Sequence, residues 1–469
     1  MSQQPLCFIL MPFGVKPDPL GGPDLDFDEI YEQALKPGVQ DAGMFPIRAD
    51  EDRTGGIIHK PMFERLLLCE FAVADLTTAN ANVFYELGVR HAARPRTTLT
   101  IFATQKPLPF DVAYLRTLPY ELGPQNSFEA GEAAALRGAV TGQLVQLRQL
   151  AVEEAAVDSP LFQLLTAWQP GDVEVLRPGS FFQQLRYNEE IKERLTDIRA
   201  KGRTSQGRAD AREELAAFYR ELPAVDALET GVLVSLMESY RALDDWDAMI
   251  GLYQKMPKVL QQQVVVRQQL AFAYNRRAGA AGAAADQNRA CAILDDLIAQ
   301  HGPNSETWGL VGRVHKDAWQ AARRDDPQAA PAHLAEAIAA YRHGFEADWS
   351  DPYPGINLVT LLEIEGSRAA LREKGRLLPV VRYGAAQRLT RKSSDYWDHA
   401  TMLELAALDR RPAEARRYLS STLAFVRESW EPRSTAANLG LIEEARMARS
   451  ADVAWLTPIR QALEERGRL

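Results

Sequence analysis

The residues whose types and spacing could do chemistry lie between positions 73 and 92, in the run VADLTTANANVFYELGVRHA. Asp75 ends an apolar stretch, and a polar loop then leads into a helical pattern that carries Asn82, Tyr85 and Glu86. A carboxylate near the positive end of a helix stays ionised, as a carboxylate nucleophile must be. Two carboxylates beside one ligand suit attack at an anomeric carbon. The run therefore predicts catalysis by Glu86 with Asp75, and substrate contacts from Asn82 and Tyr85.

Each of these residues also has a structural explanation. Glu86 could satisfy backbone donors of its helix, Asp75 could stabilise an Asx-type turn, and Tyr85 could pack instead of stacking on a ligand. His59 and His91 have no partner at motif spacing, so we interpret them as surface or helix-end residues rather than catalytic bases.

Alternating strands and helices must position these residues. A buried strand is predicted from Leu6 to Met11, and its turn continues with Pro12, Phe13 and Gly14. Another strand is predicted up to Asp75, followed by a helix over residues 82–92. This alternation predicts a mostly parallel sheet with both faces covered. Ligands bind beyond the carboxyl ends of such strands, so both loops are expected at one rim.

The rest of the chain is predicted to be helical. Residues 155–185 indicate an irregular connector, and the basic stretch 199–212 indicates a solvated linker. From about Glu213 to Leu469, helices alternate with short breaks, which predicts stacked helical hairpins of tetratricopeptide type. Trp308-x-x-Val311-Gly312 is the best match to that repeat, although His315 takes the place of its usual tyrosine.

The first part of the chain resembles a known enzyme family. The run from Asp75 to residue 92 is similar to the signature of nucleoside 2-deoxyribosyltransferases and related nucleotide N-glycosidases. The resemblance covers roughly residues 5–122 and implies a flavodoxin-like fold in which Glu86 attacks C1′ and Asp75 binds the sugar or handles a proton. It also implies that a pocket is formed by the following residues: Met11, Pro12, Phe13, Gly14, Asp50, Asn82 and Tyr85, with Asp28, Tyr31 and Arg48 as further candidates.

Toll/interleukin-receptor-like NAD hydrolases also place a catalytic glutamate on a helix at such a rim. A nucleoside, a nucleotide and NAD are therefore equally credible substrates. No other cofactor and no metal is predicted, because no Cys or His spacing of a metal site is present.

Three blocks of the helical part resemble the TRAF-binding region of apoptosis signal-regulating kinases. They run from Glu306 to Trp319, from Ala337 to Glu346 and from Tyr353 to Leu362. The resemblance spans residues 160–390 or more and implies a scaffold for oligomerisation and partner binding. The glycine-rich loop, HRD and DFG signatures of a kinase are absent from these 469 residues.

Composition limits the partners. The formal net charge of −9 argues against a general nucleic-acid binder. No apolar run approaches the roughly 20 residues of a membrane span, and three cysteines are a poor basis for a disulfide framework. The sequence therefore predicts a cytoplasmic protein without nucleic-acid or membrane partners.

Together these observations predict an α/β flavodoxin-like, deoxyribosyltransferase-like domain over residues 1–150, a connector over 151–212 and an all-α tetratricopeptide-like TRAF-binding region over 213–469. The main functional hypothesis is an N-glycosidase or NAD hydrolase in stress or defence signalling, regulated by helical repeats that bind a protein partner or another copy of the chain. Two alternatives stay open: a non-catalytic nucleotide-binding scaffold that recruits protein partners, and a salvage transferase with an appended dimerisation region.

Overall fold

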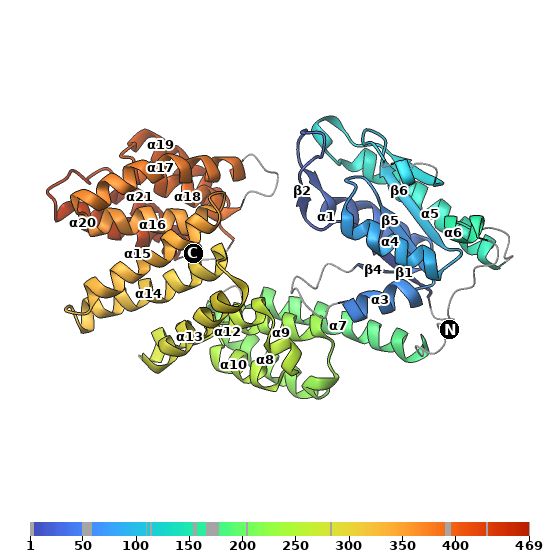
Figure 1. Cartoon of the computed structure of the whole chain (residues 1–469), viewed down its shortest axis with the longest axis horizontal. Coiled ribbons are helices and arrows are strands. Elements are labelled where there is room, and N and C mark those ends of the chain that lie inside the picture. The colour runs from blue at the N-terminus through green and yellow to red at the C-terminus, as the bar shows by residue number, and fades with distance from the viewer. Residues whose placement is uncertain are drawn as a thin grey trace. The chain divides into compact units, whose positions relative to one another are not determined.

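The computed structural model describes residues 4–48, 59–108, 110–112, 115–152, 157–165, 178–202, 205–281, 284–389, 395–427 and 430–468. The chain divides into two compact units, Met1–Tyr187 and Asn188–Leu469 (Figure 1). The boundaries predicted at residues 150 and 212 stay a prediction.

The first unit contains a five-stranded parallel sheet, as the alternating sequence pattern predicts. In chain order its strands are β1 (Leu6–Leu10), β4 (Phe45–Arg48), β5 (Phe71–Asp75), β6 (Thr98–Ala103) and β7 (Thr117–Tyr120). Their spatial order is β4-β1-β5-β6-β7, and every neighbouring pair is parallel. Every residue of β1 and β5 is buried, because a parallel sheet has helices on both faces. A short antiparallel ribbon pairs β2 (Val15–Lys16) with β3 (Leu25–Asp26).

Two hydrophobic clusters cover the two faces of this sheet. Alternate β1 residues point to opposite sides, so Cys7 and Ile9 join one cluster while Phe8 and Leu10 join the other. The cluster of Cys7 and Ile9 also contains residues of α1 (Phe27–Ile30), the π-helical turn η1 (Tyr31–Leu35), α2 (Lys36–Asp41) and α5 (Ala130–Val152). The opposite cluster contains residues of α3 (His59–Leu68) and α4 (Ala81–Ala93).

A buried arginine fixes α4 on its face of the sheet. The Arg90 guanidinium donates to the carbonyls of Leu66, Cys69 and Glu70, at 2.8, 2.6 and 3.1 Å. Leu66 belongs to the last turn of α3, while Cys69 and Glu70 connect α3 to β5, so one side chain joins α3, α4 and the sheet. His91, beside it in the last turn of α4, is buried, so of the two predicted placements, at the surface or at a helix end, it has the second.

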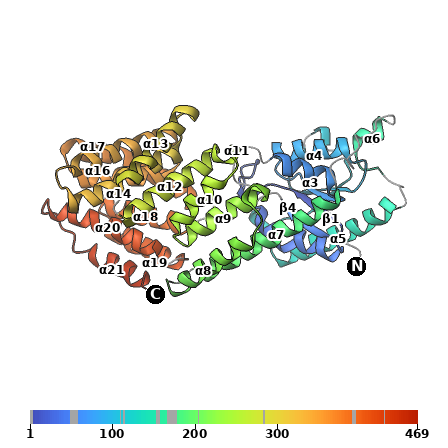
Figure 2. The same ribbon diagram turned by 90° about the horizontal axis from the view of Figure 1, so that it is seen from below.

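The second unit is mostly helical, as predicted. Its helices begin with the second part of α7 (Pro178–Lys201) and continue with α8 (Ser205–Glu221), α9 (Thr230–Ala242), α10 (Trp246–Lys255), α11 (Lys258–Gln261), α12 (Val264–Ala281), α13 (Ala284–His301), α14 (Ser305–Asp325), α15 (Ala330–Ala347), α16 (Pro352–Glu365), α17 (Arg368–Leu389), α18 (Tyr396–Leu408), α19 (Pro412–Ala424), α20 (Trp430–Met447) and α21 (Thr457–Arg466). From α12 to α19, each helix packs against the next one in the chain (Figures 1 and 2). No helix in the described ranges is both long enough and apolar enough to cross a membrane.

Two glycines of α14 permit a close approach of aromatic rings. A Cβ atom at Gly312 would lie 2.7 Å from the ring of Tyr341 on α15, and one at Gly309 would lie 2.8 Å from Tyr353 on α16. Trp319 and Phe345 are buried in the adjoining core, so both pack inside the helical unit. The sequence motif around Gly312 therefore encodes helix packing.

The basic stretch 199–212 is not the solvated linker that the sequence predicts. Its described residues end α7 and begin α8. The Arg199 guanidinium donates to the Ser235 carbonyl at 3.1 Å and to the Ser239 hydroxyl at 3.0 Å, so its charge contacts α9. The hydrophobic periodicity did not predict a helix over this stretch, because few positions at the start of α8 are apolar.

Candidate functional site

The predicted rim is formed by the loops that follow β1 and β5. These strands are parallel neighbours, with Ile9 opposite Val73 and Leu10 opposite Ala74. Their carboxyl ends therefore lie side by side. The loop after β5 leads to α4, whose N-cap is Asn80: its side chain accepts from the backbone N–H groups of Asn82 and Val83, at 3.0 and 3.3 Å.

Asp75 is buried at this rim, and both its carboxylate oxygens are bonded to the chain itself. Oδ1 accepts from the Thr77 backbone N–H at 2.9 Å, and Oδ2 accepts from the Tyr120 hydroxyl at 3.0 Å. The Thr77 hydroxyl also accepts from the Ala103 N–H at 3.0 Å. Burial raises the pKa of Asp75 to about 6, although these hydrogen bonds favour the charged form. The carboxylate thus closes an Asx-type turn, and the hydrogen bonds of Asp75 and Thr77 join β5, β6 and β7. This is the structural alternative that the sequence left open for Asp75.

Glu86 lies in the second turn of α4 and is half-buried. Its side chain accepts no hydrogen bond from any residue that the structure describes. Burial raises the pKa of Glu86 to about 7, which is the opposite of the effect expected from the positive end of a helix. The physical reason is position, because the favourable field of a helix end falls off within the first turn. Asp75 and Glu86 therefore have different environments. Both carboxylate oxygens of Asp75 accept hydrogen bonds, whereas Glu86 has no hydrogen-bond donor among the described residues.

Asn82 and Tyr85, two of the residues predicted to contact the substrate, are both exposed. Asn82 contributes its backbone to the helix cap. The Tyr85 ring is 59% exposed and meets the ring of Phe63 edge to face, with centroids 6.4 Å apart. Tyr85 thus packs against Phe63 and is still exposed to solvent. Asp50 lies outside the described residues.

The turn after β1 is held by Arg48. Its guanidinium lies over the rings of Phe13 and Tyr31, at 5.1 and 4.7 Å from their centroids, and forms an ion pair with Asp28. Asp28 accepts in turn from the Gly14 N–H at 2.9 Å, where Gly14 has a φ of 61°. Arg48 also lies 3.5 Å from the Pro12 carbonyl oxygen. The structure therefore brings the turn residues and the three weaker candidates into one group, while Met11 is buried in the core beneath them.

A cavity of about 670 Å³ lies elsewhere on the first unit, beside α2 and α5. Asp41 and Arg137 line it and form an exposed ion pair, with Nε 2.6 Å from Oδ2. None of the predicted site residues lines this cavity.

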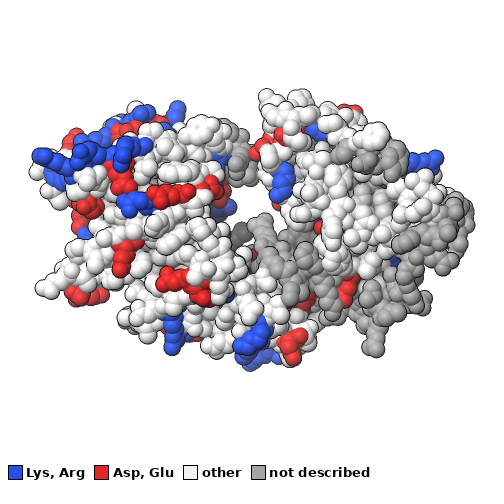
Figure 3. All heavy atoms as spheres, viewed as in Figure 1, with Lys and Arg blue, Asp and Glu red and all other residues white. Residues whose placement is uncertain are grey.

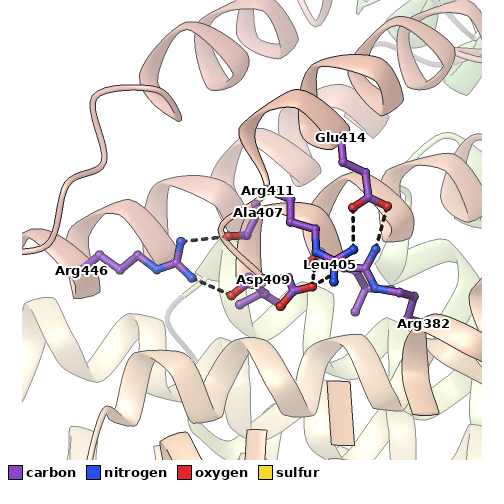
Figure 4. A network of polar contacts seen from close by, with 8 residues as sticks. Arg382, Leu405, Ala407, Asp409, Arg411, Glu414 and Arg446 are labelled. Carbon is purple, nitrogen blue, oxygen red and sulfur yellow. Dashed lines mark hydrogen bonds and ion pairs between the residues drawn. The ribbon is translucent and has the colours of Figure 1, made fainter. Parts of the chain in front are cut away.

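The second unit holds a polar network that sequence reasoning missed, at the carboxyl end of α18 (Figure 4). Arg446 of α20 donates to the carbonyls of Ala407 and Leu408 at 2.8 and 2.9 Å. Arg382 of α17 reaches Asp409 at 3.2 Å and Glu414 of α19 at 2.8 Å. The last carbonyls of a helix lack partners within it, and cations suit that end. No local signal could have found this network, because its members are far apart in the sequence.

Comparison with known proteins places most of the chain in one family. The model of the family described as MAP3K TRAFs-binding domain matches residues 83–455. Mitogen-activated protein kinase kinase kinase 15 of Mus musculus is 28% identical over 261 residues, 53% of this chain and 18% of that protein. Mitogen-activated protein kinase kinase kinase 6 of Homo sapiens is 26% identical over 340 residues, 68% of this chain and 24% of that protein. The chain thus spans at most about a quarter of these relatives.

Among solved structures, a thermophilic TPR protein of Thermus thermophilus is similar with a TM-score of 0.34 and 13% identity, over 44% of this chain and 97% of that one.

These comparisons correct the main functional hypothesis. The relatives are protein kinase kinase kinases and the matching family is named for TRAF binding, so the prediction of a nucleoside or NAD N-glycosidase, and with it of a hydrolase, is wrong. The match begins at residue 83 and therefore includes Tyr85 and Glu86, the residues on which the resemblance to a transferase rests. The TRAF-binding resemblance also extends beyond the blocks between Glu306 and Leu362. The chain belongs to the MAP3K TRAFs-binding domain family.

Proposed function

We propose that this chain is a non-catalytic signalling scaffold in a kinase-linked pathway, and that its helical unit recruits protein partners. The observation that carries the proposal is the family match over residues 83–455, which includes nearly all of the helical unit. Stacked helices offer extended surfaces for protein recognition. TRAF proteins are the partner class that the family's description names.

An exposed side of α17 is the surface that best suits such a partner. Arg368, Arg372 and Arg376 are exposed and follow each other at a spacing of one helical turn. On the same side, Val380 and Tyr383 are 39% and 68% exposed. We call these five residues the α17 face.

The chemistry of the α17 face indicates an acidic partner. Arginine and tyrosine are enriched where proteins bind each other. The face is basic although the chain has a net charge of −9, and Lys and Arg gather over the C-terminal helices in Figure 3. Charge complementarity would steer a partner with an acidic segment to this site.

The first unit adds a second binding function to this proposal. Its sheet order places the second strand of the parallel set beside the first, followed by the third, fourth and fifth, which supports a flavodoxin-like topology. In that order the ligand lies at the switch point between the two central strands, here β1 and β5. We propose that the rim of this deoxyribosyltransferase-like, Toll/interleukin-receptor-like unit binds a nucleotide without cleaving it, with contacts from the Pro12–Gly14 turn, Asn82 and Tyr85.

Binding of the full chain to purified TRAF domains, measured by calorimetry, tests the scaffold. The variant Arg368→Glu/Arg372→Glu should lose at least about tenfold in affinity, because it reverses two charges on the α17 face. The matched control is Arg220→Glu/Lys258→Glu, which reverses two exposed charges on α8 and α11. If both variants bound with equal affinity, the α17 face would not be the binding site. If the unmodified chain bound none of the TRAF domains, the proposed partner class would be wrong.

A further inference from the structure

Three side chains that could hold a metal ion converge between α14 and α15. His315 belongs to α14, while His333 and Glu336 lie one turn apart on α15. The Nδ1 atom of His315 is 2.9 Å from Oε2 of Glu336, and Nδ1 of His333 is 3.4 Å from the same oxygen. One ligand atom from each residue lies within 4.8 Å of the other two.

The approach of these atoms requires a proton or a cation between them. A neutral imidazole nitrogen without a proton and a carboxylate oxygen are both hydrogen-bond acceptors, so they repel unless a proton or a cation lies between them. Two imidazole nitrogens here face a single oxygen. The Nδ1 atom of His333 is buried and makes no hydrogen bond with any residue that the structure describes. A cation would satisfy all three atoms at once.

The electrostatics of the neighbourhood favour a cation. Asp295 of α13 lies close enough to interact electrostatically with His315 and adds negative charge.

The ligand types and spacing fit zinc. Zinc is bound by histidine nitrogen and carboxylate oxygen at about 2.0–2.2 Å, so two of its ligands in a tetrahedral site lie about 3.3 Å apart. The observed separations of 2.9 and 3.4 Å bracket that value. Magnesium and calcium prefer oxygen ligands. We propose that His315, His333 and Glu336 form a zinc site that joins α14 to α15.

The fourth position of this site faces solvent. The side chains of His333 and Glu336 are 36% and 54% exposed, against 22% for His315. A site with three protein ligands keeps one position for water or for a group from outside the chain. The metal would therefore stabilise the α14–α15 pair and leave one coordination position accessible.

The same helix contains a natural control. His343 and Glu346 repeat the His-x-x-Glu spacing of His333 and Glu336, with Nδ1 3.8 Å from Oε2. At that turn α14 presents Trp308 instead of a histidine, and its ring lies 4.8 Å from the ring of His343. The second pair thus has the spacing without the third ligand.

Zinc titration of the full chain tests the proposal. Protein freed of metal with a chelator would be titrated with Zn²⁺ in a calorimeter, and bound metal would be measured by mass spectrometry after dialysis. We expect one zinc per chain, with a rise in the melting temperature. The variants His315→Ala and His333→Ala should each weaken zinc binding by more than about 100-fold, since even outer-shell partners cost 10–100-fold. His343→Ala should bind as the unmodified chain does.

A second variant and probe separate loss of the site from loss of folding. Glu336→Gln keeps the shape of the side chain and removes the charged ligand, so it should lose zinc affinity while its circular dichroism stays unchanged. Co²⁺ should give the visible absorption of a tetrahedral site in the unmodified chain and not in Glu336→Gln. Equal zinc affinity of His315→Ala and the unmodified chain, or an equal loss in His343→Ala, would overturn the proposal.

Discussion

Arg446 and Glu363 form an ion pair inside the helical unit, with Nε of Arg446 2.8 Å from Oε1 of Glu363 and their side chains 0% and 1% exposed. Arg449 reaches the same oxygen at 2.7 Å, and Lys374 pairs with the other carboxylate oxygen. These cations hold the pKa of Glu363 below its usual value in spite of its burial. One carboxylate thus joins α16, α17 and α20.

Removing one partner of this pair should be strongly destabilising. Arg446→Met would leave the charge of Glu363 with less compensation and would remove one donor from each of the Ala407 and Leu408 carbonyls. We expect the free energy of unfolding to fall by about 3–5 kcal/mol, the range for breaking a buried pair. Urea unfolding followed by circular dichroism would measure it. The control Arg137→Ala breaks the exposed pair with Asp41 and should cost less than about 1 kcal/mol; similar losses in both variants would contradict the prediction.

Gly312→Ala should destabilise the helical unit by about 1–3 kcal/mol, because a methyl group would overlap the ring of Tyr341. The control is Gly251→Ala in α10, where an added Cβ meets nothing within 4 Å. Alanine favours a helix by roughly 0.5–1 kcal/mol over glycine, so this control should raise stability. The melting temperatures of the two variants should therefore shift in opposite directions.

Tyr120→Phe tests the structural role of Asp75. The variant removes the hydroxyl that donates to Oδ2 of Asp75, so a buried acceptor loses a partner, at a cost of about 1–3 kcal/mol. Tyr85→Phe removes an exposed hydroxyl and should change stability by less than about 0.5 kcal/mol. Thermal unfolding of the two variants gives the comparison. If Tyr120→Phe were as stable as Tyr85→Phe, the hydrogen bond to Asp75 would not support the fold.

The stability of the first unit should fall as the pH rises through the titration of Glu86. The folded pKa of about 7 lies above the usual value of 4.5, so the folded state holds this proton more tightly than the unfolded chain does. The stabilising contribution is therefore complete below about pH 4.5 and is lost as the pH rises through about 7. Glu86→Gln should remove this part of the pH dependence.

The expected size of that effect is about 2 kcal/mol, reduced from the full shift because the side chain is only half-buried. Urea titrations between about pH 5 and about pH 8 would measure it. The exposed Glu129 gives a matched control, since Glu129→Gln should leave the pH profile unchanged. A profile that is the same in Glu86→Gln and the unmodified chain would contradict the raised pKa.

The parallel sheet could be predicted because each buried strand appears in the sequence as a short apolar run. The apolar run that contains Leu6–Leu10 and the one that ends at Asp75 are continuous, and each is followed by a turn signal. The state of the two carboxylates could not be predicted in this way. Asp75 depends on Tyr120, and the pKa of Glu86 depends on burial by the fold, so neither is encoded in the run of residues around them.

The helical unit could be predicted in type but not in its polar contacts. Period and capping residues such as Asn304 and Asp395 indicate where helices begin. The proposed zinc site shows the limit, because the spacing of His333 and Glu336 is visible in the sequence while His315 comes from another helix. The glycosidase hypothesis failed for a different reason: a short signature resembled an enzyme family, although the part of it that begins at residue 83 lies within the TRAF-binding match.

The pairing of Arg446 with Glu363 also limits how the helical unit can come apart. Solenoid repeats usually unfold as a series of neighbouring modules. Here α20 supplies the charge that neutralises a carboxylate on α16 and the donors that complete α18. A chain cut before α20 would leave the buried Glu363 without Arg446 and Arg449, two of the cations that pair with it. The segment from α16 to α20 should therefore unfold as a single cooperative block, and trimming it one repeat at a time should not yield folded fragments.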